Sequence, residues 1–277
     1  YYIKSIVPFR LSPLYPYPAF LDWKFYLSIV SFIGSAYILW LSYFRKWKTV
    51  FFGLTFFLAN VFFLLQLLGA EQGFLADRFT YIPYTGLFFM YAMVAEKIYK
   101  EKAALRKPLI GFFCLILLGY GTITYKQNKI WKESETLWTH VLKYYKNTHT
   151  PWANRAAHFR DNDRISALYD YSQYILLKPD DPDPYNSRAR LYFKSNEKDS
   201  LKKALRDFTK AIELDSEDPE ILVNRGSTYA RLGDKKSALD DYNQAEKINP
   251  EYPNTYLNRS LIYNQEESWE KALNDIN

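Results

Sequence analysis

The stretch ADRFTYIPYTG, residues 76–86, places an acid–base pair just before a long apolar run. Asp77 and Arg78 precede Pro83, which suits the first turn of a helix because the N–H that proline lacks would have no partner there. An arginine beside a helix N-terminus is suited to bind an anionic phosphate group. Arg10, which stands between two prolines, is a second candidate of the same kind. The alternative is an interfacial charge pair that only anchors the helix.

A second set of polar residues recurs at one position of a repeated pattern. Its members are Asn154, Ser187, Asn224 and Asn258, and they are followed directly by Arg155, Arg188, Arg225 and Arg259. An amide side chain on a helix face could hydrogen-bond the backbone of an extended peptide. For the arginines two alternatives stay open, namely a role in binding or a place on a solvated or inter-repeat surface.

Other chemistries have little support in the sequence. Cys114 is the one cysteine, so the chain can form no internal disulfide and has no zinc-ligand spacing. His140, His149 and His158 are spaced nine residues apart, and no single helix would gather them onto one metal. The basic residues are not clustered on a folded polar face, as nucleic-acid binding would require. We therefore expect no metal, no resident cofactor and no nucleic-acid partner.

The elements that must position these residues fall into two unlike halves. Residues 1–125 carry 12 Lys and Arg against 5 Asp and Glu, whereas residues 126–277 carry 24 against 25. The first half also contains apolar stretches long enough to cross a bilayer core of about 30 Å at about 1.5 Å per helical residue. The four predicted spans are residues 25–44, 50–69, 81–99 and 109–125.

The loops between these spans predict an orientation in the membrane. The loops at 45–48 and 96–108 are basic, whereas the loop at 70–80 is not, so the positive-inside rule places the two basic loops in the cytoplasm. The lysines directly after the last span, at 126, 129 and 132, count against this orientation. With four spans, both ends of the chain would then lie outside the cytoplasm. The lack of further cysteines favours the periplasmic side of a bacterial inner membrane over the ER lumen.

From residue 126 the chain becomes polar and repetitive. Alanines at 167, 204, 238 and 272 each precede a large apolar residue by four positions, and they are 37, 34 and 34 residues apart. This period resembles the tetratricopeptide repeat (TPR), most closely over residues 219–252, where Gly226, Tyr229 and Pro250 also match. Tyr174 stands where the pattern has a small residue, which predicts looser packing in the first repeat.

The TPR resemblance implies an α-solenoid whose first helices line a concave, peptide-binding groove. The recurring Asn154, Ser187, Asn224 and Asn258 would lie in this groove, although the alternative is that Asn–Arg is merely the repeat consensus. We therefore predict an all-α protein in three parts. These are a polytopic transmembrane helix bundle over residues 1–125, a connecting TPR-like helix over 126–150, and TPRs over 151–277, with the last one truncated.

The order of these parts resembles the transmembrane and tetratricopeptide-repeat O-mannosyltransferases, which have the C-type glycosyltransferase fold. The resemblance is carried by Asp77, Arg78, Tyr81, Pro83 and Gly86, by YPYP at 15–18 and by the segment WKESETLWTHVL. Asp77 stands where members usually have Glu, which shortens the reach of the carboxylate. The resemblance implies transfer of a sugar from a polyprenyl-phosphate donor, a substrate rather than a cofactor, to an extracytoplasmic protein held by the repeats.

The same resemblance places Arg78, Arg10, Asp77 and Tyr81 near the donor phosphate, with Asp77 orienting Arg78. It also implies a catalytic carboxylate in an outward loop upstream of residue 1, so we expect these 277 residues to be inactive alone. The alternative is a non-catalytic, membrane-anchored scaffold whose repeats bind other proteins. Both hypotheses have the lipid bilayer and a protein or peptide as partners, and fold alone does not decide between them.

Overall fold

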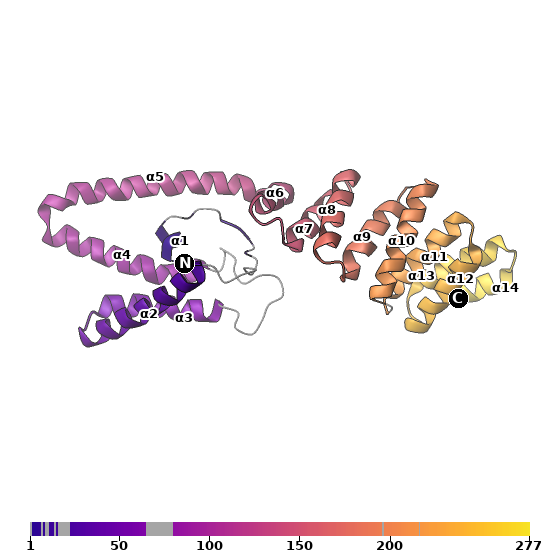
Figure 1. Cartoon of the computed structure of the whole chain (residues 1–277), viewed down its shortest axis with the longest axis horizontal. Helices are drawn as coiled ribbons and strands as arrows, with labels where there is room; N and C mark the ends of the chain where they lie inside the picture. Colours follow the sequence, from indigo (N-terminus) through magenta and orange to yellow (C-terminus); the bar gives the residue numbers. More distant parts are fainter. Residues whose placement is uncertain are drawn as a thin grey trace. The chain divides into compact units, whose positions relative to one another are not determined.

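The computed structural model describes residues 2–6, 8, 11–13, 15, 23–64, 80–195, 197–215 and 217–277 of the chain. Every regular element among these residues is a helix. The chain divides into two compact units, residues 1–145 and residues 146–277. The helices of both units are labelled in Figure 1.

The first unit is dominated by long apolar helices. Its described elements are α1 (Tyr2–Ile6), α2 (Trp23–Phe44), α3 (Lys48–Leu64), α4 (Tyr81–Glu101), the short 3₁₀ helix η2 (Ala103–Leu105), α5 (Arg106–Trp131) and α6 (Ser134–Tyr144). By length and composition, two helical stretches of the described chain could cross a bilayer, Tyr26–Phe44 and Ala103–Trp131. These correspond to the first and last of the four predicted spans.

The second and third predicted spans are not among the described helices that are long and apolar enough to cross a bilayer. Helix α4 is long enough, but its last turns carry Glu96, Lys97, Lys100 and Glu101, which lower its mean hydropathy. Helix α3 is apolar and shorter, and the end of the predicted second span, 65–69, lies outside the described residues. Two of the four predicted spans are therefore supported by length and composition.

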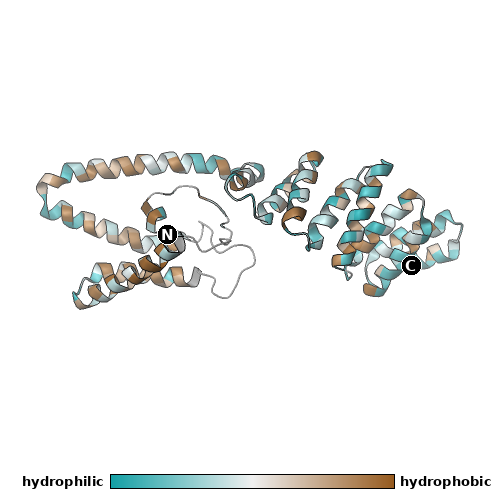
Figure 2. Ribbon diagram, viewed as in Figure 1, coloured by the Kyte–Doolittle hydropathy of each residue, from teal (hydrophilic) through white to brown (hydrophobic). Residues whose placement is uncertain are grey.

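The surfaces of α2 and α5 are not those of helices in a soluble core. Only 11% of the apolar window of α2 and none of that of α5 is buried within the protein. Figure 2 shows hydrophobic residues over both helices, and Leu115, Leu117 and Leu118 of α5 are each about two-thirds exposed. Apolar surface on this scale is unfavourable in water, so it calls for cover by lipid or another apolar partner.

Helices α3 and α4 cross in close contact because two glycines face each other. A methyl group at Gly86 would lie 2.5 Å from the carbonyl oxygen of Gly53, and one at Gly53 would lie 2.7 Å from that of Gly86. Because glycine has no side chain, the two helix backbones can approach this closely. Leu54, Phe57 and Leu87 form the buried core beside this crossing.

The second unit is an array of helix pairs that follow one another in chain order (Figure 1). The described pairs are α7 (His149–Phe159) with α8 (Arg164–Leu177), α9 (Pro182–Phe193) with α10 (Lys198–Leu214), α11 (Pro219–Leu232) with α12 (Lys235–Ile248), and α13 (Pro253–Gln265) with α14 (Trp269–Ile276). Local sequence sets many of the helix starts. The side chains of Asp163, Asp181, Asp218 and Asp234 each cap a helix N-terminus by accepting a backbone N–H bond of 2.8 to 3.1 Å.

The predicted seam of small and large residues is buried in the first three pairs. Ala167, Ala204 and Ala238 are fully buried, and so are Phe208 and, within 1%, Tyr242. In the third pair a second small residue, Gly226 on α11, packs against this seam, and a methyl group there would lie 2.8 Å from Cε1 of Tyr242. Close packing of this kind makes each helix pair depend on a small residue at one position. In the last pair Ala272 is buried but Ile276 is exposed.

The first pair does not pack loosely around Tyr174, contrary to the prediction. Tyr174 is buried, its hydroxyl donates to Oδ2 of Asp181 at 3.0 Å, and its ring stacks on His149 with centroids 5.0 Å apart. The larger residue therefore fills the junction between α8 and α9 and bonds to the aspartate that caps α9. Burial, and then the bond to Asp181, raise the pKa of Tyr174 far above its usual range.

Candidate functional site

The predicted phosphate-binding residues are mostly outside the part of the chain that the structure describes. Arg10, Asp77 and Arg78 fall in the segments without description. Tyr81 is the first residue of α4 and is 74% exposed. Pro83 lies in the first turn of α4 as predicted, and Gly86 is needed for the contact with Gly53. Part of the motif therefore has a packing role.

The second predicted set comes together on the array. Asn154, Ser187, Asn224 and Asn258 occupy the same position on α7, α9, α11 and α13, and all four are partly buried. The amide nitrogen of Asn154 donates to the carbonyl oxygen of Thr150 in its own helix at 3.1 Å. These side chains retain exposed surface on the first helices of successive pairs.

The arginine that follows each of them has a different place. Its Nε and one terminal nitrogen bond both oxygens of an aspartate on the second helix of the same pair, at 2.6 to 2.9 Å. The pairs are Arg155–Asp170, Arg188–Asp207, Arg225–Asp241 and Arg259–Asp275. We call these four pairs the Arg–Asp ladder. Bidentate ion pairs of this form combine charge with fixed geometry.

Three ladder arginines also reach the preceding pair. The Nη1 atom of each arginine donates a hydrogen bond. Arg188 donates to Oγ of Ser172 at 2.9 Å, Arg225 to Oγ1 of Thr209 at 3.5 Å, and Arg259 to Oδ1 of Asn243 at 2.8 Å. Each acceptor lies on the second helix of the preceding pair, so each arginine ties three helices together.

The electrostatics agree with a structural role for the ladder. The hydrogen bond to Asp241 raises the pKa of Arg225 despite its burial. In Arg188 burial is the largest single effect and lowers the pKa, but the hydrogen bond to Asp207 and the charge of that carboxylate raise it overall. Of the alternatives for the arginines, the structure therefore favours inter-repeat packing. Sequence reasoning missed the ladder, although an aspartate 15, 16 or 19 residues after each arginine was its signal.

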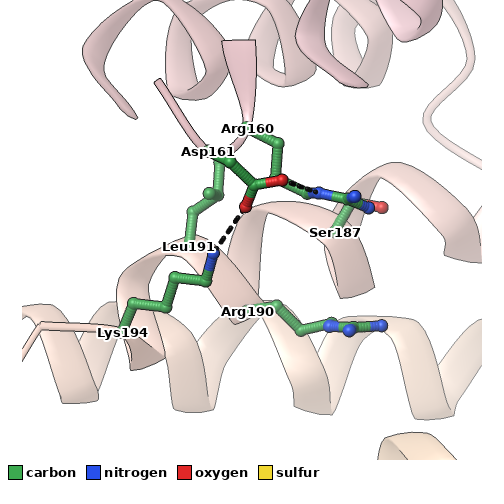
Figure 3. A pocket seen from close by; sticks show the side chains of 6 residues that line it. All are labelled: Arg160, Asp161, Ser187, Arg190, Leu191 and Lys194. Carbon is green, nitrogen blue, oxygen red and sulfur yellow. Dashed lines mark hydrogen bonds and ion pairs between the residues drawn. The ribbon is translucent and has the colours of Figure 1, made fainter. Parts of the chain in front are cut away.

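A pocket of about 230 Å³ lies where α7 ends beside α9. It is lined by Arg160, Asp161, Ser187, Arg190, Leu191 and Lys194. Figure 3 shows Asp161 between two cations, and its carboxylate accepts from Lys194 at 2.9 Å and from Arg160 at 3.5 Å. The bond from Lys194 is the main cause of the lowered pKa of Asp161. Ser187 thus belongs both to the predicted set and to this pocket.

Contacts between first helices continue beyond the pocket. Nη1 of Arg190 donates to Oε1 of Glu220 on α11 at 2.8 Å. Nη1 of Arg231 on α11 donates to the carbonyl oxygen of Phe193 at 2.8 Å, and its guanidinium lies 3.9 Å from the centre of the Phe193 ring. Among the described residues, no group of three or more His, Cys, Asp or Glu side chains could hold a metal ion.

The match to a known protein family lies within the array. The tetratricopeptide repeat family matches residues 219–252, which comprise α11, α12 and the loop that leads to α13. Residues 219–252 are a tetratricopeptide repeat. The other three pairs of the TPR array share the period and the Arg–Asp ladder with this repeat. No curated protein sequence gave a significant match.

Solved structures similar to the chain include proteins described as TPR proteins. The crystal structure of MamA has a TM-score of 0.48 at 16% identity, over 54% of this chain and 88% of that one. YrrB, described as a TPR protein with an unusual peptide-binding site, has a TM-score of 0.45 at 16% identity, over 65% of this chain and 87% of YrrB. The Arabidopsis OM64 TPR domain has a TM-score of 0.38 at 19% identity, over 41% of this chain and 93% of that domain.

Proposed function

We propose that this protein is a membrane-anchored scaffold that binds segments of other proteins on the first helices of its TPR array. The observation that carries the proposal is that adjacent residues of each first helix have different surroundings. The ladder arginines form ion pairs with aspartates of the second helices. The residue before each arginine remains partly exposed, namely Asn154, Ser187, Asn224 and Asn258. An array of stacked repeats offers an extended surface of this kind to a peptide.

Membrane anchoring is supported by the apolar surface of α2 and α5. Cys114, in the apolar part of α5, is exposed on the protein, so only lipid or a partner would shield it. A membrane-impermeant maleimide is expected to leave Cys114 unlabelled in intact membranes and to label it after denaturation. Rapid labelling in intact membranes would show that α5 does not span the bilayer. The TPR array would lie outside the cytoplasm, on the periplasmic face of a bacterial inner membrane.

The array's side of the membrane is tested with the same chemistry. In a Cys114→Ser background, a cysteine replacing the exposed Lys236 of α12 should react with the impermeant maleimide on intact cells whose outer membrane is permeabilised. Labelling only after the inner membrane is disrupted would place the TPR array in the cytoplasm instead.

The binding proposal is tested with a randomised peptide library displayed against the purified full chain. Replacing Asn154, Ser187, Asn224 and Asn258 with alanine should abolish enrichment of the selected sequences. A matched control replaces Gln173, Gln244 and Asn274, amides on second helices, with alanine and should leave enrichment unchanged. No enrichment by the unaltered chain, or equal loss in both variants, would contradict binding on the first helices.

A second candidate function is transfer of a sugar from a polyprenyl-phosphate donor to proteins held by the array. The motif Asp77, Arg78, Tyr81, Pro83 and Gly86, set between apolar stretches ahead of a TPR array, favours it. Its test is an Arg78→Ala variant of the full reading frame, followed by glycan analysis of envelope proteins. Loss of a glycan with normal membrane insertion supports transfer, whereas an unchanged glycan profile leaves the scaffold.

A further inference from the structure

Four exposed cations gather on the first helices of three successive repeats. We call this set the basic face: Arg160 directly after α7, Arg190 and Lys194 at the end of α9, and Arg231 at the end of α11. Two acidic side chains contact this set, Asp161 and Glu220, so four positive charges face two negative ones and leave +2. The corresponding end of α13 carries no basic residue.

These cations differ from the ladder arginines in how firmly they are held. The Arg190–Glu220 and Lys194–Asp161 pairs have side chains that are all between 43% and 61% exposed. Exposed ion pairs contribute little to stability, because water screens them and long side chains lose entropy. A cation at a helix C-terminus is favoured by the helix dipole, but this leaves its charge accessible. The basic face can therefore exchange its present partners for the carboxylates of a ligand.

The pocket shows where such a carboxylate would bind. Arg160 and Arg190 both line it, and Figure 3 shows their guanidinium groups extending in the same direction, one from the turn after α7 and the other from α9. Ser187 adds a hydroxyl, and the buried Leu191 adds an apolar wall. A guanidinium presents paired donors that match the two oxygens of a carboxylate. The next cations are Lys194, directly after α9, and Arg231, at the end of the following first helix α11, so one acidic segment could reach them in turn.

We propose that the basic face binds an acidic peptide segment, with a Glu or Asp carboxylate between Arg160 and Arg190 and further carboxylates on Lys194 and Arg231. This inference rests on the proposed scaffold function and names the chemistry of its partner. Because the attraction is electrostatic and near the surface, binding should weaken as salt is raised. Charge complementarity would also exclude basic segments from the same surface.

The experiment measures binding of three peptides of equal length to the purified full chain. The peptides share one sequence in which every second residue is Glu, Gln or Lys. We expect the Glu peptide to bind most tightly, and its affinity to fall with salt. The double variant Arg160→Gln, Arg190→Gln should bind it about tenfold more weakly, because each lost contact is worth a few-fold.

The matched control is Lys202→Gln, Lys236→Gln, which removes two exposed charges from second helices and should leave the affinity unchanged. Equal affinity for the Glu and Gln peptides, or equal loss in both double variants, would overturn the acidic specificity while the scaffold function stands. Binding of none of the three peptides, in a chain whose helical circular dichroism is intact, would overturn the acidic specificity, and enrichment from the randomised library would then show whether the scaffold function stands.

Discussion

Removing Arg225 from the Arg–Asp ladder should weaken the TPR array by more than the loss of one surface charge. Its side chain is 17% exposed, and that of its partner Asp241 is 6% exposed. Nε and Nη2 donate to the two carboxylate oxygens at 2.9 and 2.6 Å. Arg225→Ala leaves the Asp241 carboxylate nearly buried without its cation, which costs about 3–5 kcal/mol for a fully buried pair. Because this pair keeps some solvent access, we expect about 2–3 kcal/mol.

The partner variant and the double variant separate the pair from other effects. Asp241→Ala should cost a similar amount, because the guanidinium then loses the partner that raises its pKa. The double variant should cost less than the sum of the two single variants, by a coupling free energy of about 2 kcal/mol. Lys236→Ala, which truncates an exposed lysine of α12, should change stability by no more than about 0.5 kcal/mol.

The assay is hydrogen exchange of the full chain, with mass spectrometry resolving the amides of α10, α11 and α12. Exchange reports local opening free energies, so the array is followed separately from the apolar unit. Because Arg225 also reaches Thr209 on α10, faster exchange should spread into α10. Additive effects of the single variants, or exchange that is unchanged in α12, would refute the reasoning that the pair joins these helices.

Three further outcomes follow from the same array. Gly226→Val should destabilise the third pair by roughly 2–3 kcal/mol in thermal unfolding, because a side chain there overlaps the buried Tyr242 ring; an unchanged melting temperature would contradict the close contact. Asp218→Ala removes the cap of α11 and should cost about 1 kcal/mol, measurable as a lower urea midpoint at the same slope. Burial, followed by the charge of the nearby Lys178, lowers the pKa of His149 below 6.5. The contribution of neutral His149 to folding stability is therefore fully present above pH 6.5 and is lost as the pH falls through the lowered pKa. His149→Phe, which keeps the stack on Tyr174, should remove that pH dependence of exchange in α7 and α8.

Local patterns in the sequence specify the helices of the array and which of their faces are buried. Helical periodicity and the alanine that precedes a large apolar residue are local signals, and this alanine recurs every 34 to 37 residues. The repeat predicted the seam of Ala238 and Tyr242, which the structure buries, whereas the contact of Gly226 with the Tyr242 ring is seen only in the structure. The apolar lengths of α2 and α5 were likewise legible, because crossing a bilayer depends on length and composition.

Which polar groups contact one another depends on how the helices pack. Arg225 and Asp241 lie 16 residues apart on two helices, and their pairing depends on how those helices cross. The same holds for Tyr174, which was expected to disturb the first pair and instead bonds to the cap of the next helix. The basic face unites residues 160, 190, 194 and 231, which no local pattern connects. Periodicity specifies how each helix is oriented, but a polar contact also requires the neighbouring helix at a definite distance and angle.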